Sequence, residues 1–152
     1  MSLAIPQHYP LVGLGVAGLW AVNIWQQILV MKARKESGVA YPNLYATDAE
    51  AKADPKKHRF NCVQRANQNS LENVTFVLPL SLFFGLFHPK LATAFTLTYI
   101  VGRIGYTLGY SSGQPDKRNN MISRVQYIGL FGLLIGTINV SAKAAIAYVQ
   151  SL

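Results

Sequence analysis

No Asp, Glu, Lys or Arg occurs between Met1 and Met31 of this 152-residue chain. Leu11 to Met31 is an almost entirely apolar run, and its length is about the 20 residues that a helix needs to cross the hydrocarbon core of a bilayer. A cleaved secretory signal would carry basic residues ahead of the apolar run, whereas here Lys32, Arg34 and Lys35 follow it. This pattern predicts an uncleaved first membrane span.

The composition agrees with a membrane protein. Hydrophobic residues make up 51% of the chain and charged residues only 13%, which is roughly half the charge content of ordinary soluble proteins. The net charge of +8 comes without zinc-ligand spacing, a Gly-rich phosphate loop or a basic-aromatic patch, so we expect no nucleic-acid partner. The single cysteine, Cys62, excludes an intrachain disulfide and is interpreted as a packed side chain rather than a reactive thiol.

Three further apolar stretches follow the first, separated by polar or turn-forming segments. The pattern predicts one all-α domain over residues 1–152, an integral membrane four-helix bundle. A short surface helix is expected around Ala49 to Ala53, and Pro79 is expected to kink the second span. The predicted spans are about 8–35, 59–87, 90–112 and 121–149.

Basic residues predict the orientation of these spans, because short cytoplasmic loops are enriched in Lys and Arg. The first and third connections hold most of them, whereas the opposite side has only Lys90 and Lys143. We therefore expect the first and third connections to face the cytosol and both termini to face away from it.

The densest polar cluster of the chain runs from Phe60 to Asn73, directly ahead of an apolar run. Arg65, Asn69 and Glu72 have the spacing of one helix face. Arg65 and Glu72 are about 10 Å apart along the helix axis, which we interpret as too far for a simple salt bridge and suited to an extended ligand. Ionisable groups at membrane depth are costly and are usually functional.

The third predicted span carries a similar face, formed by Arg103, Tyr106 and Tyr110. Interfacial Tyr and Arg can merely anchor a helix at the headgroup level, and polar residues can merely hold helices together. For the two tyrosines, anchoring and ligand binding are equally good interpretations.

Several segments together resemble the family of membrane-associated proteins in eicosanoid and glutathione metabolism, and most of all its microsomal glutathione S-transferase 3 branch. They are Arg-Ala-Asn-Gln-Asn-Ser-Leu-Glu at 65–72, Gly-Arg at 102–103, Tyr-Thr-Leu-Gly-Tyr at 106–110, Lys-Ala-Arg-Lys at 32–35, and Gly-Gln-Pro-Asp-Lys-Arg at 113–118. The resemblance implies a homotrimer in the endoplasmic reticulum membrane, with the mitochondrial outer membrane as a second location. It also implies that glutathione, as co-substrate, binds between subunits on the cytosolic side.

The resemblance assigns roles to individual residues. Residues expected to bind glutathione within one subunit are Arg65, Asn69, Glu72, Tyr106 and Tyr110, and those expected to come from the adjacent subunit are Arg34 and Asn67. Arg118 matches the arginine that activates the thiol, with Lys117 as its competitor, and Tyr110 is the second expected catalytic residue.

Elementary chemistry fits these roles. Arginines pair with carboxylates, so Arg65 and Arg34 suit the glutathione carboxylates, while Glu72 suits its ammonium group. A cation lowers the pKa of a nearby thiol, and a guanidinium stays charged while doing so. The sequence has no His or Cys cluster with metal-ligand spacing, so we expect no metal.

The implied activity is glutathione transfer to lipophilic electrophiles, with lipid hydroperoxide reduction and leukotriene-C synthase-like activity as further expectations. Asn73 departs from the leukotriene-C synthase pattern, which has Tyr there, and this counts against a dedicated leukotriene synthase. Two alternatives stay open. One is a non-catalytic lipid-binding adaptor on the same scaffold, because a fold alone does not establish catalysis. The other is a purely structural four-span protein.

Overall fold

The computed structural model describes residues 5–152, and every regular element within this range is a helix. The all-α class predicted from the sequence is therefore confirmed, and the short helix expected at residues 49–53 is present as α2. The first four residues of the predicted domain lie outside the described range. In chain order the elements are η1 (Tyr9–Leu11), α1 (Val12–Ser37), α2 (Asp48–Ala53), α3 (Pro55–Gly85), α4 (Pro89–Tyr110), η2 (Pro115–Asn119) and α5 (Met121–Gln150).

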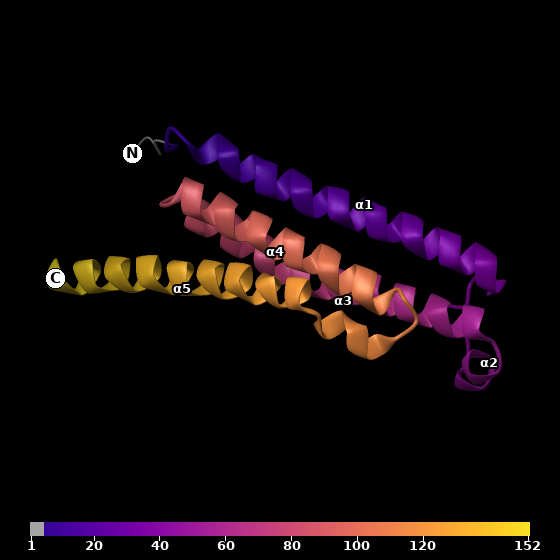
Figure 1. Ribbon diagram of the computed structural model, residues 1–152. Coiled ribbons are helices and arrows are strands. Elements are labelled where there is room, and N and C mark those ends of the chain that lie inside the picture. Colours follow the sequence, from indigo (N-terminus) through magenta and orange to yellow (C-terminus); the bar gives the residue numbers. More distant parts are fainter. Residues whose placement is uncertain (1–4) are drawn as a thin grey trace.

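The four long helices α1, α3, α4 and α5 run side by side (Figure 1). The small helix α2 and the connection containing η2 lie toward one end of the molecule, which we call the loop end. The turn between α3 and α4 and the C-terminus lie at the other end. The first and third connections, which carry most of the basic residues, are thus brought to the same end of the structure.

Side-chain caps fix where the helices at the loop end begin. Thr47 forms a capping box with Glu50, in which each side chain accepts a hydrogen bond from the other residue's backbone N–H. Asp54 and Asn120 cap α3 and α5, and each accepts a backbone N–H bond of 2.8 Å from the first turn. Gly38 ends α1 with a positive φ of 69°, a conformation that glycine adopts without a Cβ clash.

Two stretches of the described chain are long and apolar enough to cross a membrane: Tyr9–Ser37, which is η1 with α1, and α5. Within their most apolar 18-residue stretches, only 17% and 11% of the residues are buried. A core helix of a soluble protein would bury most of the residues in such a stretch. Outward apolar faces of this length suit lipid or a neighbouring subunit. The helices α3 and α4 do not meet the same criterion, so crossing by all four helices stays a prediction.

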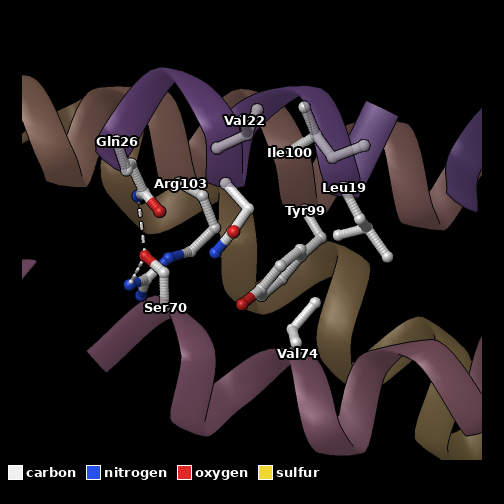
Figure 2. A pocket seen from close by; sticks show the side chains of 9 residues that line it. Leu19, Val22, Gln26, Ser70, Val74, Tyr99, Ile100 and Arg103 are labelled. Carbon is white, nitrogen blue, oxygen red and sulfur yellow. Dashed lines mark hydrogen bonds between the residues drawn. The ribbon is translucent and has the colours of Figure 1, made fainter. Parts of the chain in front are cut away.

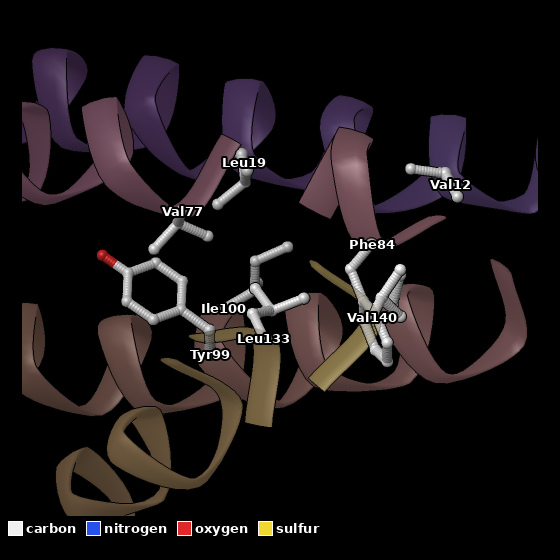
Figure 3. Packing of buried hydrophobic residues seen from close by; sticks show 9 residues of the cluster. Val12, Leu19, Val77, Phe84, Tyr99, Ile100, Leu133 and Val140 are labelled. Atoms are coloured by element: carbon white, nitrogen blue, oxygen red, sulfur yellow. The ribbon is translucent and has the colours of Figure 1, made fainter. Parts of the chain in front are cut away.

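An apolar core lies between the four long helices in the half of the bundle remote from the loop end (Figure 3). Its buried members are Val12, Leu19, Val77, Phe84, Ala92, Tyr99, Ile100, Leu133 and Val140. A second buried cluster at the loop end joins α1 to α3 and consists of Ala33, Val39, Ala46, Phe60 and Val63. Between these two apolar clusters lies a level of the bundle at which several buried side chains are polar.

The helices α4 and α5 pack backbone against backbone through glycines. A Cβ on Gly102 would lie 2.2 Å from the backbone nitrogen of Gln126, and a Cβ on Gly129 would lie 2.4 Å from the carbonyl oxygen of Phe95. Small residues allow this close approach in membrane proteins. The approach places Gln126 beside Arg103 in the bundle interior.

Candidate functional site

The two charged ends of the polar face on α3 meet directly. Arg65 Nη1 lies 2.9 Å from Glu72 Oε1, and both side chains are about half exposed. The expectation that the helix axis keeps these residues too far apart for a salt bridge is therefore wrong, because two long side chains extend toward each other across two helical turns. Asn69, on the same face, donates from Nδ2 to Glu72 Oε2 at 3.5 Å. An ion pair this exposed is worth only ~0–1 kcal/mol, so a charged ligand can displace it.

Two adjacent tyrosine rings with an arginine at each end form a row along α4 toward the loop end. The guanidinium carbon of Arg103 lies 4.2 Å from the ring centroid of Tyr106, which meets Tyr110 edge to face at 5.7 Å. The guanidinium carbon of Arg118 lies 5.4 Å from the ring centroid of Tyr110. Arg103 also donates from Nη2 to Asn69 Oδ1 at 3.1 Å, which connects this row to the face on α3. The structure thus joins two groups of residues that the sequence separates.

An open hollow of about 440 Å³, which we call the end hollow, lies at the loop end beside this row. Its lining residues are Tyr45, Asp48, Ala51, Lys52, His58, Asn61, Cys62, Arg65, Tyr110 and Pro115. The Tyr45 hydroxyl donates to the side-chain oxygen of Gln68. Burial raises the pKa of Tyr45, and the nearby Arg65 opposes that shift. Tyr45 stays a neutral hydrogen-bonding group at physiological pH, and the sequence did not indicate this role.

Contacts from the start of α3 hold the connection that carries Arg118. Arg59 donates from Nε to the carbonyl oxygen of Ser111 at 3.2 Å and pairs with Glu36 at 2.7 Å. His58 Nε2 lies 3.2 Å from the carbonyl oxygen of Gly113. Arg118 itself donates from Nη1 to the carbonyl oxygen of Pro115 at 3.0 Å. The half-buried Arg118 side chain is therefore held against Tyr110 and Pro115, two residues that line the end hollow.

Lys117 differs from its neighbour in exposure and in contacts. Its side chain is exposed, and its carbonyl oxygen accepts a 3.0 Å bond from Asn120. That same carbonyl would lie 2.1 Å from a Cβ on Gly109. The backbone of Lys117 is therefore packed against α4, while only Arg118 reaches the ring of Tyr110.

The structure does not bring Arg34 and Asn67 into the end hollow. Arg34 is buried, donates from Nη1 to the carbonyl oxygens of Val39 and Asn43, and stacks on the rings of Tyr41 and Phe60. Asn67 is also buried, and it follows Arg65 by two residues, which turns it to another face of α3. Both residues were expected to act from an adjacent subunit, and a single chain leaves that expectation untested.

The buried polar level of the bundle forms a network that we call the polar hub: Gln26, Asn69, Ser70, Arg103, Thr107 and Gln126. Gln26 Nε2 donates to Ser70 Oγ at 2.7 Å and to Thr107 Oγ1 at 2.6 Å. Arg103 donates to Ser70 Oγ at 2.6 Å and to Gln126 Oε1 at 2.9 Å. The polar hub therefore links all four long helices.

Most of the polar hub was not predicted from the sequence. Arg103 lies beside Tyr106 as its spacing predicted, but it is also 3% exposed and lies in the bundle interior, which was not predicted. The available signals were Gln26 within an uncharged run and Gln126 within the last apolar run. An isolated amide inside a membrane span is expected to have a polar partner on another helix.

The thiol of Cys62 is buried, and its Sγ lies 3.7 Å from His58 Nε2. Within residues 5–152, no three His, Cys, Asp or Glu side chains gather in a way that could hold a metal ion.

Fold and site together define a helical membrane protein with an ion-paired polar face, a cation-aromatic row and an open hollow at its loop end. The model of the MAPEG family matches residues 12–139, from the first residue of α1 into the second half of α5. The chain belongs to this family, which includes glutathione transferases and peroxidases.

Proposed function

We propose that this protein is a membrane-bound glutathione S-transferase that conjugates glutathione to lipophilic electrophiles and also reduces lipid hydroperoxides. Within the family we place it nearest to the microsomal glutathione S-transferase 3 branch. One observation carries the proposal: Arg65, which pairs with Glu72, and Tyr110, whose ring lies against the Arg118 guanidinium, both line the end hollow. Asn69 contacts Glu72, and Tyr106 contacts Tyr110.

The charges of glutathione match this arrangement. Glutathione has two carboxylates, one ammonium group and a thiol, so Arg65 suits a carboxylate and Glu72 suits the ammonium. Both groups are already paired with each other. Binding would therefore exchange one exposed ion pair for two ligand contacts. The Asn69 side chain, which donates to Glu72, would move with the Glu72 carboxylate.

The thiol would be activated by Arg118, with Tyr110 next to it. Only the thiolate is a strong nucleophile, and a fixed positive charge near the sulfur lowers the pKa of the thiol. The ring of Tyr110 and the carbonyl of Pro115 hold the Arg118 guanidinium in place. These contacts support Arg118 over the exposed Lys117 as the activating cation.

Two reactions follow from a thiolate at this position. In conjugation, the sulfur forms a bond to an electrophilic carbon, while an epoxide C–O bond opens or a leaving group departs. In peroxide reduction, two glutathione thiols are oxidised to a disulfide, and the hydroperoxide is reduced to an alcohol and water. Asn73 stands where leukotriene-C synthases of the family carry Tyr, so we propose leukotriene-C synthase-like activity only as a side reaction.

We further propose that the protein works as a homotrimer in the endoplasmic reticulum membrane, or in the mitochondrial outer membrane. Arg34 would contribute from the neighbouring subunit, with Asn67 beside it. Within residues 5–152, the Arg34 guanidinium uses only Nη1 for hydrogen bonds, which leaves Nη2 for a ligand. Native mass spectrometry from lipid nanodiscs tests the trimer, and a monomer that retains full activity would contradict it.

The test of the chemistry is the thiolate absorbance that develops when the purified protein is mixed with glutathione. We expect this signal in the wild type, its loss in Arg118→Ala, and its retention in Lys117→Ala. Equilibrium dialysis should show that Arg118→Ala still binds glutathione, since the binding charges lie elsewhere. A signal retained in Arg118→Ala but lost in Lys117→Ala would transfer the role to Lys117. No glutathione binding by the wild type would reject the transferase and favour the lipid-binding adaptor.

A further inference from the structure

A small, partly open cavity lies at the polar hub, between α1, α3 and α4 (Figure 2). Its volume of about 20 Å³ exceeds the roughly 10–15 Å³ that one water molecule needs. Apolar side chains form part of its wall, and the polar part comes from Asn23, Gln26, Ser70, Tyr99 and Arg103. The cavity is thus large enough for one water and too small for an organic ligand.

Three polar atoms on these lining residues lack a hydrogen-bond partner within the described chain: Gln26 Oε1, Tyr99 Oη and Arg103 Nε. Their side chains are only 1%, 2% and 3% exposed. Figure 2 shows the Tyr99 hydroxyl pointing toward the space beside the Gln26 amide and the Arg103 side chain. An unsatisfied buried donor or acceptor destabilises the fold, so three of them on residues that line one cavity indicate a missing partner.

The chemistry of the three atoms selects the ligand. Arg103 Nε can only donate, Gln26 Oε1 can only accept, and a tyrosine hydroxyl can do either. A water molecule satisfies all three, because it accepts from Arg103, donates to Gln26 and bonds Tyr99 in either sense. An anion would be repelled by the Gln26 side-chain oxygen, and a metal cation would be repelled by the positive charge of Arg103. We infer that this cavity is a binding site for one internal water molecule.

The water would complete the hydrogen bonding of Arg103. Nη1 already donates to Gln126, and Nη2 donates to Ser70 and Asn69. With Nε bonded to the water, the guanidinium is fixed on all sides and holds both Asn69 and the ring of Tyr106. Arg103 is therefore a positioning residue for the glutathione site, and this part of the inference depends on the proposed function.

The first test is a structure of the full-length wild-type protein in lipid, without glutathione, at a resolution that shows ordered waters. We expect one density peak within about 3.2 Å of Gln26 Oε1, Tyr99 Oη and Arg103 Nε. A well-resolved cavity without density, or a direct bond between these groups, would overturn the water site. This outcome does not depend on whether the protein is a transferase.

The second test uses Tyr99→Phe, which removes one partner of the water, and Tyr148→Phe as a matched control on the exposed end of α5. In Tyr99→Phe we expect a weaker water peak and an increase of about threefold in the KM for glutathione, corresponding to part of one hydrogen bond. The kcat at saturating glutathione should not change, and Tyr148→Phe should match the wild type. A wild-type KM in Tyr99→Phe, or an equal fall in kcat, would overturn the positioning role. Failure of the wild type to bind glutathione would reject the proposed function. The density peak would then be the only result that decides whether the water site exists.

Discussion

Arg65 and Glu72 pair with each other, so the proposed binding of glutathione at this position would be an exchange of partners. The pair is half exposed, and its electrostatic energy is therefore screened by solvent. Removing either partner leaves the other without its normal counter-charge. The affinity for glutathione should accordingly depend on both members of the pair, although neither charge is buried.

We expect Glu72→Gln to weaken glutathione binding about tenfold, because a hydrogen bond to a charged group is worth about 1.5–3 kcal/mol and this site is partly solvated. Titration calorimetry in detergent measures the change. Glu36→Gln is the matched control, since it removes the carboxylate of the exposed Arg59 pair at the same end of the molecule. Unaltered affinity in Glu72→Gln would contradict the role of the α3 face.

The stability of α2 depends on pH through the ionisation of Glu50. Hydrogen bonds from Lys57 and Thr47 lower its pKa from 4.5 to about 2 in the folded protein. Because the folded pKa is lowered, the carboxylate stabilises α2 above about pH 4.5, and this contribution is lost as the pH falls through about 2. The protection factors of the α2 amides, which are corrected for the intrinsic pH dependence of hydrogen exchange, should therefore fall over this range. In Glu50→Gln the same amides should be less protected at neutral pH, and the loss of protection on acidification should be smaller. Equal pH profiles in the two proteins would contradict this account.

At the scale of elements, the contact between α4 and α5 is the most sensitive to side-chain size. Gly102 and Gly129 meet backbone atoms of the facing helix, which cannot move without separating the two helices. Separation would also stretch the bond from Arg103 to Gln126, and so would disturb the polar hub. The packing of this helix pair and the geometry of the candidate site are therefore coupled.

We expect Gly102→Ala to destabilise the protein by about 1–3 kcal/mol, the usual cost of overpacking a close contact. Thermal unfolding in detergent should show a lower midpoint, accompanied by weaker glutathione binding. Gly13→Ala is the control, because nothing lies within 4 Å of a Cβ at that position of α1, and its midpoint should match or exceed that of the wild type. Equal midpoints for the two variants would argue against the tight α4–α5 contact.

At the scale of the whole molecule, both connections rich in basic residues lie at the loop end, beside the end hollow. The charge rule then predicts that the end hollow faces the cytosol. The opposite end holds the α3–α4 turn and the C-terminus.

Cysteine accessibility tests this orientation in sealed vesicles with the cytosolic face outward, using Cys62→Ser as the background. Ser112→Cys at the loop end should react with a membrane-impermeant maleimide at once. Lys90→Cys, in the opposite turn, should react only after permeabilisation. The reverse pattern would invert the topology, and labelling of both sites in sealed vesicles would contradict a membrane-crossing bundle.

Features that depend on local sequence were predictable here. The apolar runs predicted the long helices, and the short helix expected at residues 49–53 is α2, whose Thr47 capping box the structure added. The shared face of Arg65 and Glu72 followed from helical spacing, but their salt bridge did not, since it depends on how two flexible side chains extend. The polar hub was not predictable, because its bonds need the relative registers of four helices, which no single segment encodes.

The composition of the polar hub also has a consequence for how the chain matures during translation. Arg103 leaves the ribosome after its α3 partners, but it precedes Gln126 by 23 residues. A polypeptide that stops within this interval keeps a guanidinium in the bundle interior without its α5 acceptor. Such a chain keeps the bonds from Arg103 to Ser70 and Asn69 but lacks the one to Gln126. A hydrogen bond to a charged group is worth about 1.5–3 kcal/mol, so we expect the first three long helices to become fully stable only when the last one arrives.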